Sequence, residues 1–347
     1  MAILLTGLTG EVGSALAPIL QSKDKVFCLV RNGKARMKNG KLNEIPADQI
    51  IDGDIFINEQ CGISSTDLES LKKQGIAKII HAAASVKFDE QLSDEIWKTN
   101  FSGTKNILFV AKELGVKELH FLSTAYAPKG RNPYEKSKAA AEDLVKKSGF
   151  IYSIYRLSIV IGNSKTGHTN GFNGYYGFFA GLHRLAERIR QKEGRNRKVQ
   201  LPIYINCSFE STLNLVPIDW VVQILSTLIN SPCQNEIYYI THPNPPKVQW
   251  VMEQGYETLN IEGIMYNDYK KCQPEQNDRR LQIIQKAVNR ELERYRPYVT
   301  EEEKMCLEKT QQYLGINYID PPSITSQLLS ILLKFAIERN FKNEIKG

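Results

Sequence analysis

The chain has 347 residues, which suits one large α/β unit or a main domain with a smaller partner. Its 42% hydrophobic and 24% charged residues exclude disorder and fibrous repeats, and the mean hydropathy of −0.34 argues against a membrane span. The net charge of +7 suits phosphorylated or acidic small partners and is too low for a nucleic-acid-binding protein.

The six cysteines are scattered and form no CxxC pair, so we expect neither a metal site nor a redox pair. The first residues, MAILLTGLTG, lack the basic region and cleavage site of a signal peptide. We therefore expect a cytoplasmic protein with reduced thiols.

In chain order, residues 2–5 form a short apolar run, a Gly-rich turn follows, and apolar residues then recur at helical spacing up to residue 20. Further strands are expected at 26–30, 79–80, 118–123 and 151–161, and helices at 103–114 and 134–147. This alternation predicts an α/β fold with a Rossmann-type doubly wound parallel sheet.

The pattern changes after residue 161. Residues 162–181 contain six glycines and an aromatic cluster, and 213–240 resemble the sheet domain again. From residue 245 onward the chain is expected to be helical, and its last amphipathic helix, 328–337, to pack on the core. We therefore predict a dinucleotide-binding domain at 1–161 and 213–244. A smaller, mostly helical and discontinuous substrate lobe would comprise 162–212 and 245–347.

The first turn carries glycines at three-residue intervals between a predicted strand and helix. Such a turn lets backbone N–H groups approach a pyrophosphate, and the helix N-terminus favours negative charge. The same glycines also suit an ordinary tight turn, but their place after the first strand favours a dinucleotide. The expected contacts are Thr6, Gly7, Thr9, Gly10, Glu11, Val12 and Gly13.

The second strand ends at Arg31, where NAD-selective folds usually carry an acid for the ribose. An arginine there can pair with a 2′-phosphate, and Lys34 and Arg36 lie nearby, so we favour NADP(H). A solvated arginine at a strand end is the alternative. Asp54, followed by Ile55, could accept a hydrogen bond from the adenine amino group or could be an ordinary turn residue.

Tyr134 and Lys138 are four residues apart, so on a helix they share one face. A nearby ammonium lowers the pKa of a phenol and makes it a usable proton donor. Tyr266 and Lys270 have the same spacing, which shows that spacing alone carries little information. The first pair is distinguished by Ser123 and Thr124, which end a predicted strand about ten residues earlier and could place a hydroxyl on the same substrate oxygen. We expect chemistry only at this pair.

At this point the chain resembles the extended short-chain dehydrogenase/reductase superfamily. The resemblance rests on TGLTGEVG, His81–Ala84 (HAAA), Ser123–Tyr126 (STAY) and Tyr134–Lys138 (YEKSK). Further segments resemble the branch of thioester reductases and fatty acyl-CoA reductases, including reductive release domains of carrier-protein assembly lines. They are GDI, CGISSTDLESL, HAAASVKFDE, KTNFSGTKNIL, YRLSIVIGNSKTG, NLVPIDWV and YYITHPNPP. The resemblance extends from residue 2 to about 246 and is weaker at 292–298 and 321–341.

This resemblance implies NADPH-dependent reduction of an acyl thioester to an aldehyde, and onward to an alcohol in some relatives, without metal or flavin. Thr124, Tyr134 and Lys138 would be catalytic, and the last two would also border the cofactor. The turn glycines would hold the pyrophosphate and Arg31 the 2′-phosphate. Ala82, Ala83 and Ala84 would line the nicotinamide ribose.

Two departures from the branch are visible. The span from Thr124 to Tyr134 is shorter than in most relatives, which removes a loop beside the substrate. Leu157 stands where a proline is common after the strand arginine. The first departure bears on substrate choice or access, and the second on local packing.

Several interpretations stay open at this level. The aromatics of 172–179 could form an acyl pocket or a core between lobes, and the basic stretch 184–198 could be a solvated face or a contact for CoA, phosphopantetheine or an acidic carrier protein. The same catalytic residues also serve nucleotide-sugar epimerases and hydroxysteroid-type dehydrogenases. A non-catalytic dinucleotide sensor is the third reading.

Overall fold

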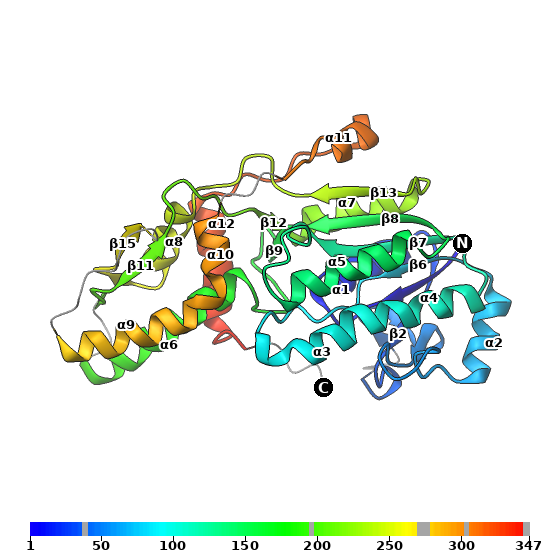
Figure 1. Cartoon of the computed structure of the whole chain (residues 1–347), viewed down its shortest axis with the longest axis horizontal. Helices are drawn as coiled ribbons and strands as arrows, with labels where there is room; N and C mark the ends of the chain where they lie inside the picture. The colour runs from blue at the N-terminus through cyan, green and yellow to red at the C-terminus, as the bar shows by residue number, and fades with distance from the viewer. Residues whose placement is uncertain (37–40, 194–197, 269–277, 302–304, 343–347) are drawn as a thin grey trace.

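A seven-stranded parallel sheet forms the centre of the computed structural model, which describes residues 1–36, 41–193, 198–268, 278–301 and 305–342 (Figure 1). The strand order is β13-β8-β7-β6-β1-β2-β5. The bounds are β1 (Ala2–Thr6), β2 (Lys25–Val30), β5 (Ile50–Asp52), β6 (Ile76–His81), β7 (Glu118–Thr124), β8 (Ile151–Leu157) and β13 (Glu236–Ile240). The predicted Rossmann-type doubly wound fold is confirmed.

The two faces of this sheet bury different residues of each strand, as the two-residue period requires. On β1, Ile3 and Leu5 pack under α1 (Glu11–Gln21) and α7 (Ile218–Asn230). Leu4 belongs to the opposite core, under α2 (Ser65–Gln74), α4 (Gly103–Glu113) and α5 (Pro133–Lys146). Strand order reverses at β1, between β2 and β6, and such a point opens a ligand crevice at the carboxyl ends of the strands.

A second core lies beside the sheet domain. It is built from α6 (Tyr175–Glu193), α8 (Val248–Thr258), α9 (Arg279–Leu292) and α12 (Ser326–Glu338). Two short parallel pairs join it: β10 (Val199–Gln200) with β14 (Ile261–Glu262), and β11 (Tyr204–Cys207) with β15 (Met265–Asp268). The expectation of only helices after residue 245 is wrong here, because strands this short show no period of their own. Tyr266 lies on β15, and Lys270 is outside the described residues.

The chain returns to the sheet where expected. β9 (Ile159–Ile161) pairs with β12 (Leu215–Pro217), and β13 then lies next to β8. The exact domain boundaries stay a prediction.

The other short elements are η1 (Lys34–Arg36), β3 (Lys41–Leu42), β4 (Ile45–Pro46), η2 (Ala47–Gln49), η3 (Glu90–Leu92), α3 (Ser93–Trp97), η4 (Lys98–Ser102), η5 (Glu293–Tyr295), α10 (Arg296–Thr300), α11 (Glu308–Leu314) and η6 (Gly315–Asn317).

The last helix, α12, packs as its amphipathic pattern predicts. Leu329, Leu332 and Leu333 are fully buried in the second core, and the Thr325 hydroxyl caps the helix by accepting from the Leu328 amide at 3.2 Å. In the part of the chain that the structure describes, no helix is long and apolar enough to cross a membrane.

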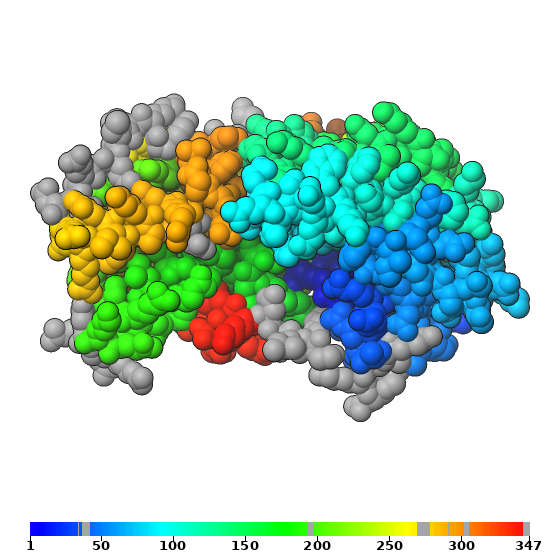
Figure 2. All heavy atoms as spheres, turned by 60° about the horizontal axis from the view of Figure 1, so that its bottom comes forward, coloured from blue at the N-terminus to red at the C-terminus, as the bar shows by residue number. Residues whose placement is uncertain are grey.

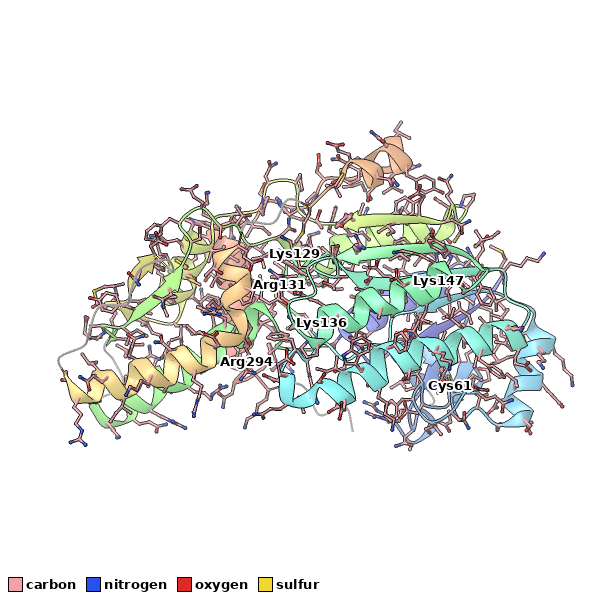
Figure 3. The ribbon with its side chains drawn as sticks, viewed as in Figure 1. Cys61, Lys129, Arg131, Lys136, Lys147 and Arg294 are labelled. Carbon is pink, nitrogen blue, oxygen red and sulfur yellow. The ribbon has the colours of Figure 1, made fainter. Side chains whose placement is uncertain are left out.

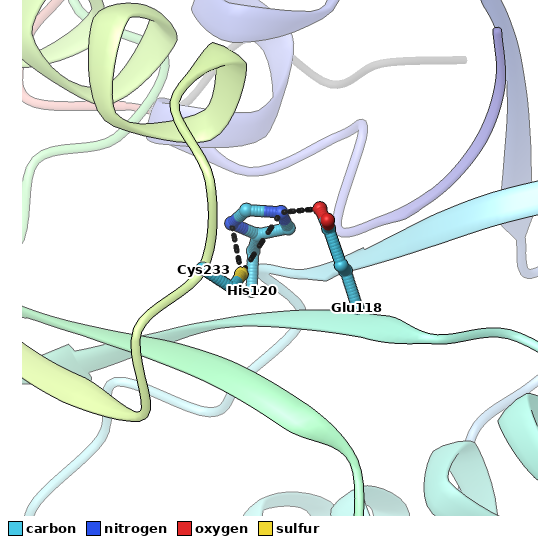
Figure 4. A group of neighbouring side chains, drawn as sticks. All are labelled: Glu118, His120 and Cys233. Atoms are coloured by element: carbon cyan, nitrogen blue, oxygen red, sulfur yellow. Dashed lines mark hydrogen bonds and ion pairs between the residues drawn. The ribbon is translucent and has the colours of Figure 1, made fainter.

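A compact polar cluster sits at the amino ends of the strands, away from the crevice (Figure 4). Nε2 of His120 lies 3.7 Å from Oε2 of Glu118 and 3.7 Å from Sγ of Cys233. These are residue types that bind metals, but Nζ of Lys78 lies 3.4 Å from the same Glu118 oxygen and supplies the positive charge. We therefore interpret the cluster as an ion pair with hydrogen-bonded neighbours at the amino ends of β6 and β7.

Acid is expected to destabilise this fold. Burial lowers the pKa of His81 to about 3, with the Lys138 charge adding to the effect, and burial also lowers the pKa of His120. Below the unfolded pKa of about 6.5 the unfolded chain binds the extra protons, so His81 should lower the free energy of unfolding by up to about 1.4 kcal/mol per pH unit, and His120 should add to this loss. Urea unfolding at pH 7, 6 and 5 measures this loss. A free energy of unfolding that stays constant over that range would contradict it, and His120→Gln should reduce the slope.

Candidate active site

A cavity of about 470 Å³ opens at the carboxyl ends of the central strands, where they meet the second core. Figure 2 shows the molecule hollowed there, with the dark-blue atoms of the N-terminal segment at the floor of the hollow. One side is lined by the Gly-rich turn and the catalytic candidates, and the other by apolar and aromatic residues. The predicted cofactor and substrate sides thus belong to one continuous space.

The turn fits tightly between strand ends. Gly7 has φ +82°, and a Cβ there would lie 2.7 Å from the backbone of Ala82 and Ala83. A Cβ on Gly13 would overlap the carbonyl of Gly7. Gly10 donates its amide to the Gly7 carbonyl at 2.9 Å, and α1 begins immediately afterwards. The turn therefore presents backbone N–H groups and a helix N-terminus to the cavity, as an anion site requires.

Thr6 acts behind the turn instead of in the cavity. It is fully buried, and its Oγ1 accepts from the Ala83 amide at 3.1 Å and lies 2.8 Å from Nδ1 of His81. These contacts fix the end of β1 to the end of β6. Of the three alanines that follow His81, Ala82 and Ala84 line the cavity. Thr9, Gly10, Glu11 and Val12 also line it.

The catalytic candidates converge from two elements. Thr124 is the last residue of β7, and Tyr134 is on the first turn of α5, which Asn132 caps by accepting from the Glu135 amide at 3.0 Å. The Thr124 hydroxyl lies beside the Tyr134 phenol and favours its ionised form. One turn later, Nζ of Lys138 donates to the Leu122 carbonyl at 2.6 Å. All three predicted residues line the cavity.

The pKa of Tyr134 differs from the expectation drawn from the sequence. Burial raises the pKa of Tyr134 to about 12, and the Thr124 hydroxyl only partly offsets it. The expectation that an ammonium lowers the phenol pKa is therefore wrong for this structure, because desolvation is the larger effect. Burial also lowers the pKa of Lys138 to about 7, against the raising effect of Glu142. Tyr134 is thus a neutral phenol at pH 7, which can donate a proton.

The neighbouring hydroxyl, Ser123, faces a different partner. It donates to Oε1 of Glu142 at 2.6 Å, and this buried carboxylate forms an ion pair with Arg156 at 2.7 Å. Of the two adjacent strand-end hydroxyls, Thr124 is the one that faces Tyr134. Leu157, which stands where relatives often carry proline, pairs with Ile240 within the sheet and is buried.

The residues expected around the adenine end lie outside this cavity. The Arg31 side chain is 64% exposed, with its Nη1 3.9 Å from Oδ2 of Asp54. The structure brings these two together, and their contacts with a cofactor stay a prediction. Ile55 is buried against Gly103 of α4, so it is a core residue here. The side chain of Lys34 is outside the described residues.

A loop of the second lobe, residues 169–171, closes the cofactor side. The Asn170 amide donates to Oε2 of Glu11 at 2.6 Å, and its side chain donates to the Ser14 hydroxyl at 2.7 Å. The Glu11 carboxylate is therefore engaged with this loop. Sequence reasoning placed Glu11 in the turn but gave no sign of Asn170, since the contact joins positions 159 residues apart.

On the apolar side of the cavity, aromatic residues of the 172–179 cluster belong both to the second core and to the cavity wall. Tyr175, Phe178 and Phe179 are buried in the second core and also line the cavity. They face Val251 and Met252 of α8 across it. In the basic stretch that follows, Arg184 and Arg188 are exposed, whereas Arg190 pairs with Glu187 at 2.6 Å; Arg195 and Arg197 are outside the described residues.

Tyr295, Tyr298 and Ser158 are among the lining residues that sequence reasoning did not single out. Tyr295 and Tyr298 come from η5 and α10, where the sequence showed a weak family resemblance and an aromatic pair in a charged segment. Ser158 follows β8 and has a buried hydroxyl without a hydrogen-bond partner among the described residues. A buried hydroxyl of this kind at a strand end marks a place where a ligand group can bind.

A family model described as male sterility protein, an NAD-binding domain, matches residues 5–132 and 128–225. The chain belongs to the male sterility protein family. This family belongs to the thioester reductase branch of the extended short-chain dehydrogenase/reductases, as the sequence resemblance implied.

This male sterility family protein is also similar to individual curated proteins. It is 29% identical over 146 residues to fatty acyl-CoA reductase wat of Drosophila melanogaster, covering 36% of this chain and 28% of that one. It is 36% identical over 109 residues to a 3β-hydroxysteroid dehydrogenase/isomerase of monkeypox virus, covering 26% and 32%. The match therefore spans about a third or less of the length of these two relatives.

Among solved structures, the chain is similar to the terminal R domain of the myxalamid PKS-NRPS pathway. The TM-score is 0.75 at 23% identity, and the match covers 98% of this chain and 91% of that one. At this identity the likeness establishes a shared fold, including the second lobe, and carries no residue roles.

Proposed function

We propose that this protein is an NADPH-dependent reductase of acyl thioesters, bound to CoA or to a carrier protein, that releases an aldehyde. The observation that carries this proposal is the position of Thr124, Tyr134 and Lys138 between the glycine turn and an apolar cavity. The similarity to a fatty acyl-CoA reductase and to the myxalamid R domain supports the substrate class.

The residues present fit a nicotinamide dinucleotide. The cradle of Gly7 and Gly13 is one that a Cβ would fill, and the N-terminus of α1 suits a pyrophosphate. The unpartnered Ser158 hydroxyl is a further polar contact at the cavity. A reduced nicotinamide, when bound, supplies the hydride. Arg31 would hold a 2′-phosphate through charge-assisted hydrogen bonds, which favours NADPH over NADH.

The chemistry of this chain's residues follows from their protonation. The neutral Tyr134 phenol donates a proton to the thioester oxygen as negative charge develops there. The Thr124 hydroxyl and the charge of Lys138 stabilise the same oxygen. The product of this step is a hemithioacetal, whose C–S bond breaks to release a thiol and an aldehyde. A second round at the same residues would convert the aldehyde to an alcohol.

A dehydrogenase or epimerase acting on a ketone or alcohol is the second candidate. The observation that favours it is the identity with the monkeypox 3β-hydroxysteroid dehydrogenase/isomerase. A dinucleotide sensor needs the glycine turn but not Tyr134 or Lys138, so the complete catalytic set argues against it.

The deciding experiment follows NADPH oxidation with a panel of acyl-CoAs and carrier-loaded acyl thioesters, and measures aldehyde, alcohol and free thiol. Thioester-dependent oxidation with release of one thiol per aldehyde supports the reductase. No turnover of any thioester, together with oxidation or reduction of ketone or alcohol substrates, would favour the second candidate.

Cofactor selectivity gives a separate prediction. Arg31→Gln is expected to weaken NADPH binding about tenfold or more, because one or two charge-assisted hydrogen bonds are lost. NADH binding should change by less than about twofold, since NADH lacks the 2′-phosphate. Titration of both dinucleotides by nicotinamide fluorescence measures the ratio. Lys72→Gln, which removes an exposed cation paired with Glu113, is the control. Equal weakening of NADPH and NADH would contradict the prediction.

A further inference from the structure

A short segment of the C-terminal lobe contacts the amino-terminal turn of α5. We name residues 293–301, which comprise η5 and α10, the strap. Figure 3 shows Arg131 and Arg294 at the junction between the strap and the sheet domain. Nη1 of Arg294 lies 3.3 Å from Oδ1 of Asp89, and Nη1 of Arg131 donates to the Pro297 carbonyl and to Glu301, both at 3.3 Å. The strap is therefore tied to two different loops of the sheet domain.

The central contact of the strap is Tyr298. Its hydroxyl donates to Oε1 of Glu135 at 2.7 Å and accepts from Nδ2 of Asn132 at 2.9 Å. Glu135 is completely buried, and Arg131 binds it through several hydrogen bonds, the shortest from the guanidinium being 2.9 Å. These two partners of Tyr298 flank Tyr134 in the sequence, one on each side.

The ring of Tyr298 is held as firmly as its hydroxyl. It meets the Tyr126 ring edge-on at 5.1 Å between centroids, and the Arg131 guanidinium lies 4.5 Å from its centre. Burial beside Glu135 raises the pKa of Tyr298, so its hydroxyl stays protonated and continues to donate. Both Tyr298 and Tyr126 line the cavity. The strap thus forms part of the cavity wall, and it also contacts the first turn of α5.

From these contacts we propose that Tyr298 is a positioning residue for Tyr134. Its hydroxyl fixes the cap and the third residue of α5, and so the place of the Tyr134 phenol relative to the reacting carbonyl. Displacement of a reacting group by about 1 Å can cost about 100-fold in rate, so a partial loss of this restraint has a measurable effect. The inference rests on the proposed function, since it assigns a role in that reaction.

The test is Tyr298→Phe, which removes the two hydrogen bonds and keeps the ring. We expect kcat with an acyl thioester to fall about tenfold while KM changes less than about twofold. The primary isotope effect with NADPH deuterated at the transferred position should rise, because the chemical step becomes slower. Tyr313→Phe is the matched control: it removes one hydrogen bond, to the Pro232 carbonyl, on α11 outside the cavity.

A readout that needs no turnover separates this inference from the proposed function. Backbone amide exchange across residues 133–138 should become faster in Tyr298→Phe and stay unchanged in Tyr313→Phe. A wild-type protein that reduces no thioester would reject the proposed function, and unchanged exchange would reject the positioning contact itself. An unchanged kcat, or a rise in KM alone, would show that Tyr298 is only a wall of the cavity and would overturn the proposal.

Discussion

Replacing Tyr134 by Phe should lower thioester-dependent NADPH oxidation by a factor of about 10² to 10⁴, the usual contribution of a positioned proton donor. The hydroxyl is the group that would protonate the substrate oxygen, and it lies beside Thr124. The ring would keep its place on α5, so the NADPH dissociation constant should change by less than about twofold. Steady-state kinetics and fluorescence titration measure the two quantities.

The chain supplies a matched control for this variant. Tyr266 also stands four residues before a lysine, but it lies on β15 and its hydroxyl donates to the Gln249 carbonyl at 3.4 Å. Tyr266→Phe should leave kcat nearly unchanged. Full activity in Tyr134→Phe would remove the tyrosine from the mechanism. Loss of NADPH binding in that variant would instead assign the phenol a cofactor role.

The parts of the site that the sequence predicts are those with local causes. The glycine turn is specified by Gly7, Gly10 and Gly13, whose spacing follows from the approach of β1, β6 and α1. The pair Tyr134 and Lys138 is specified by helical periodicity, and Thr124 by its place at a strand end. Each of these signals lies within one strand, turn or helix, and that is why the sequence alone points to these residues.

The parts that were missed depend on tertiary contacts. Asn170 meets Glu11, and Tyr298 meets Glu135, across more than 150 residues, so no spacing reveals them. The raised pKa of Tyr134 has the same origin, because the number of groups packed around a phenol is decided by the whole fold. The strands β14 and β15 were missed since each is stable only beside a partner from residues 199–207.

The C-terminal lobe therefore completes the site in a way that motif analysis cannot show. The glycine turn and α5 come from the sheet domain, whereas the apolar side of the cavity is lined by α6, α8 and the strap. Tyr126, which lies in the span between Thr124 and Tyr134, contacts Tyr298 of the strap edge-on. The strap and this span therefore line the cavity together.

A substitution in the glycine turn should have the second large effect, which is on NADPH binding and not on the chemical step. In Gly13→Ala the new methyl group would overlap the Gly7 carbonyl, so the turn must move away from β6 or α1 must shift. Either movement displaces the backbone N–H groups that face the cavity, and overpacking of this kind costs about 1–3 kcal/mol. We expect the NADPH dissociation constant to rise roughly 10- to 100-fold. Gly75→Ala, at a positive-φ helix end with open space around it, should lower the melting temperature without changing NADPH affinity. Tight binding in a well-folded Gly13→Ala protein would show that the dinucleotide does not depend on this turn.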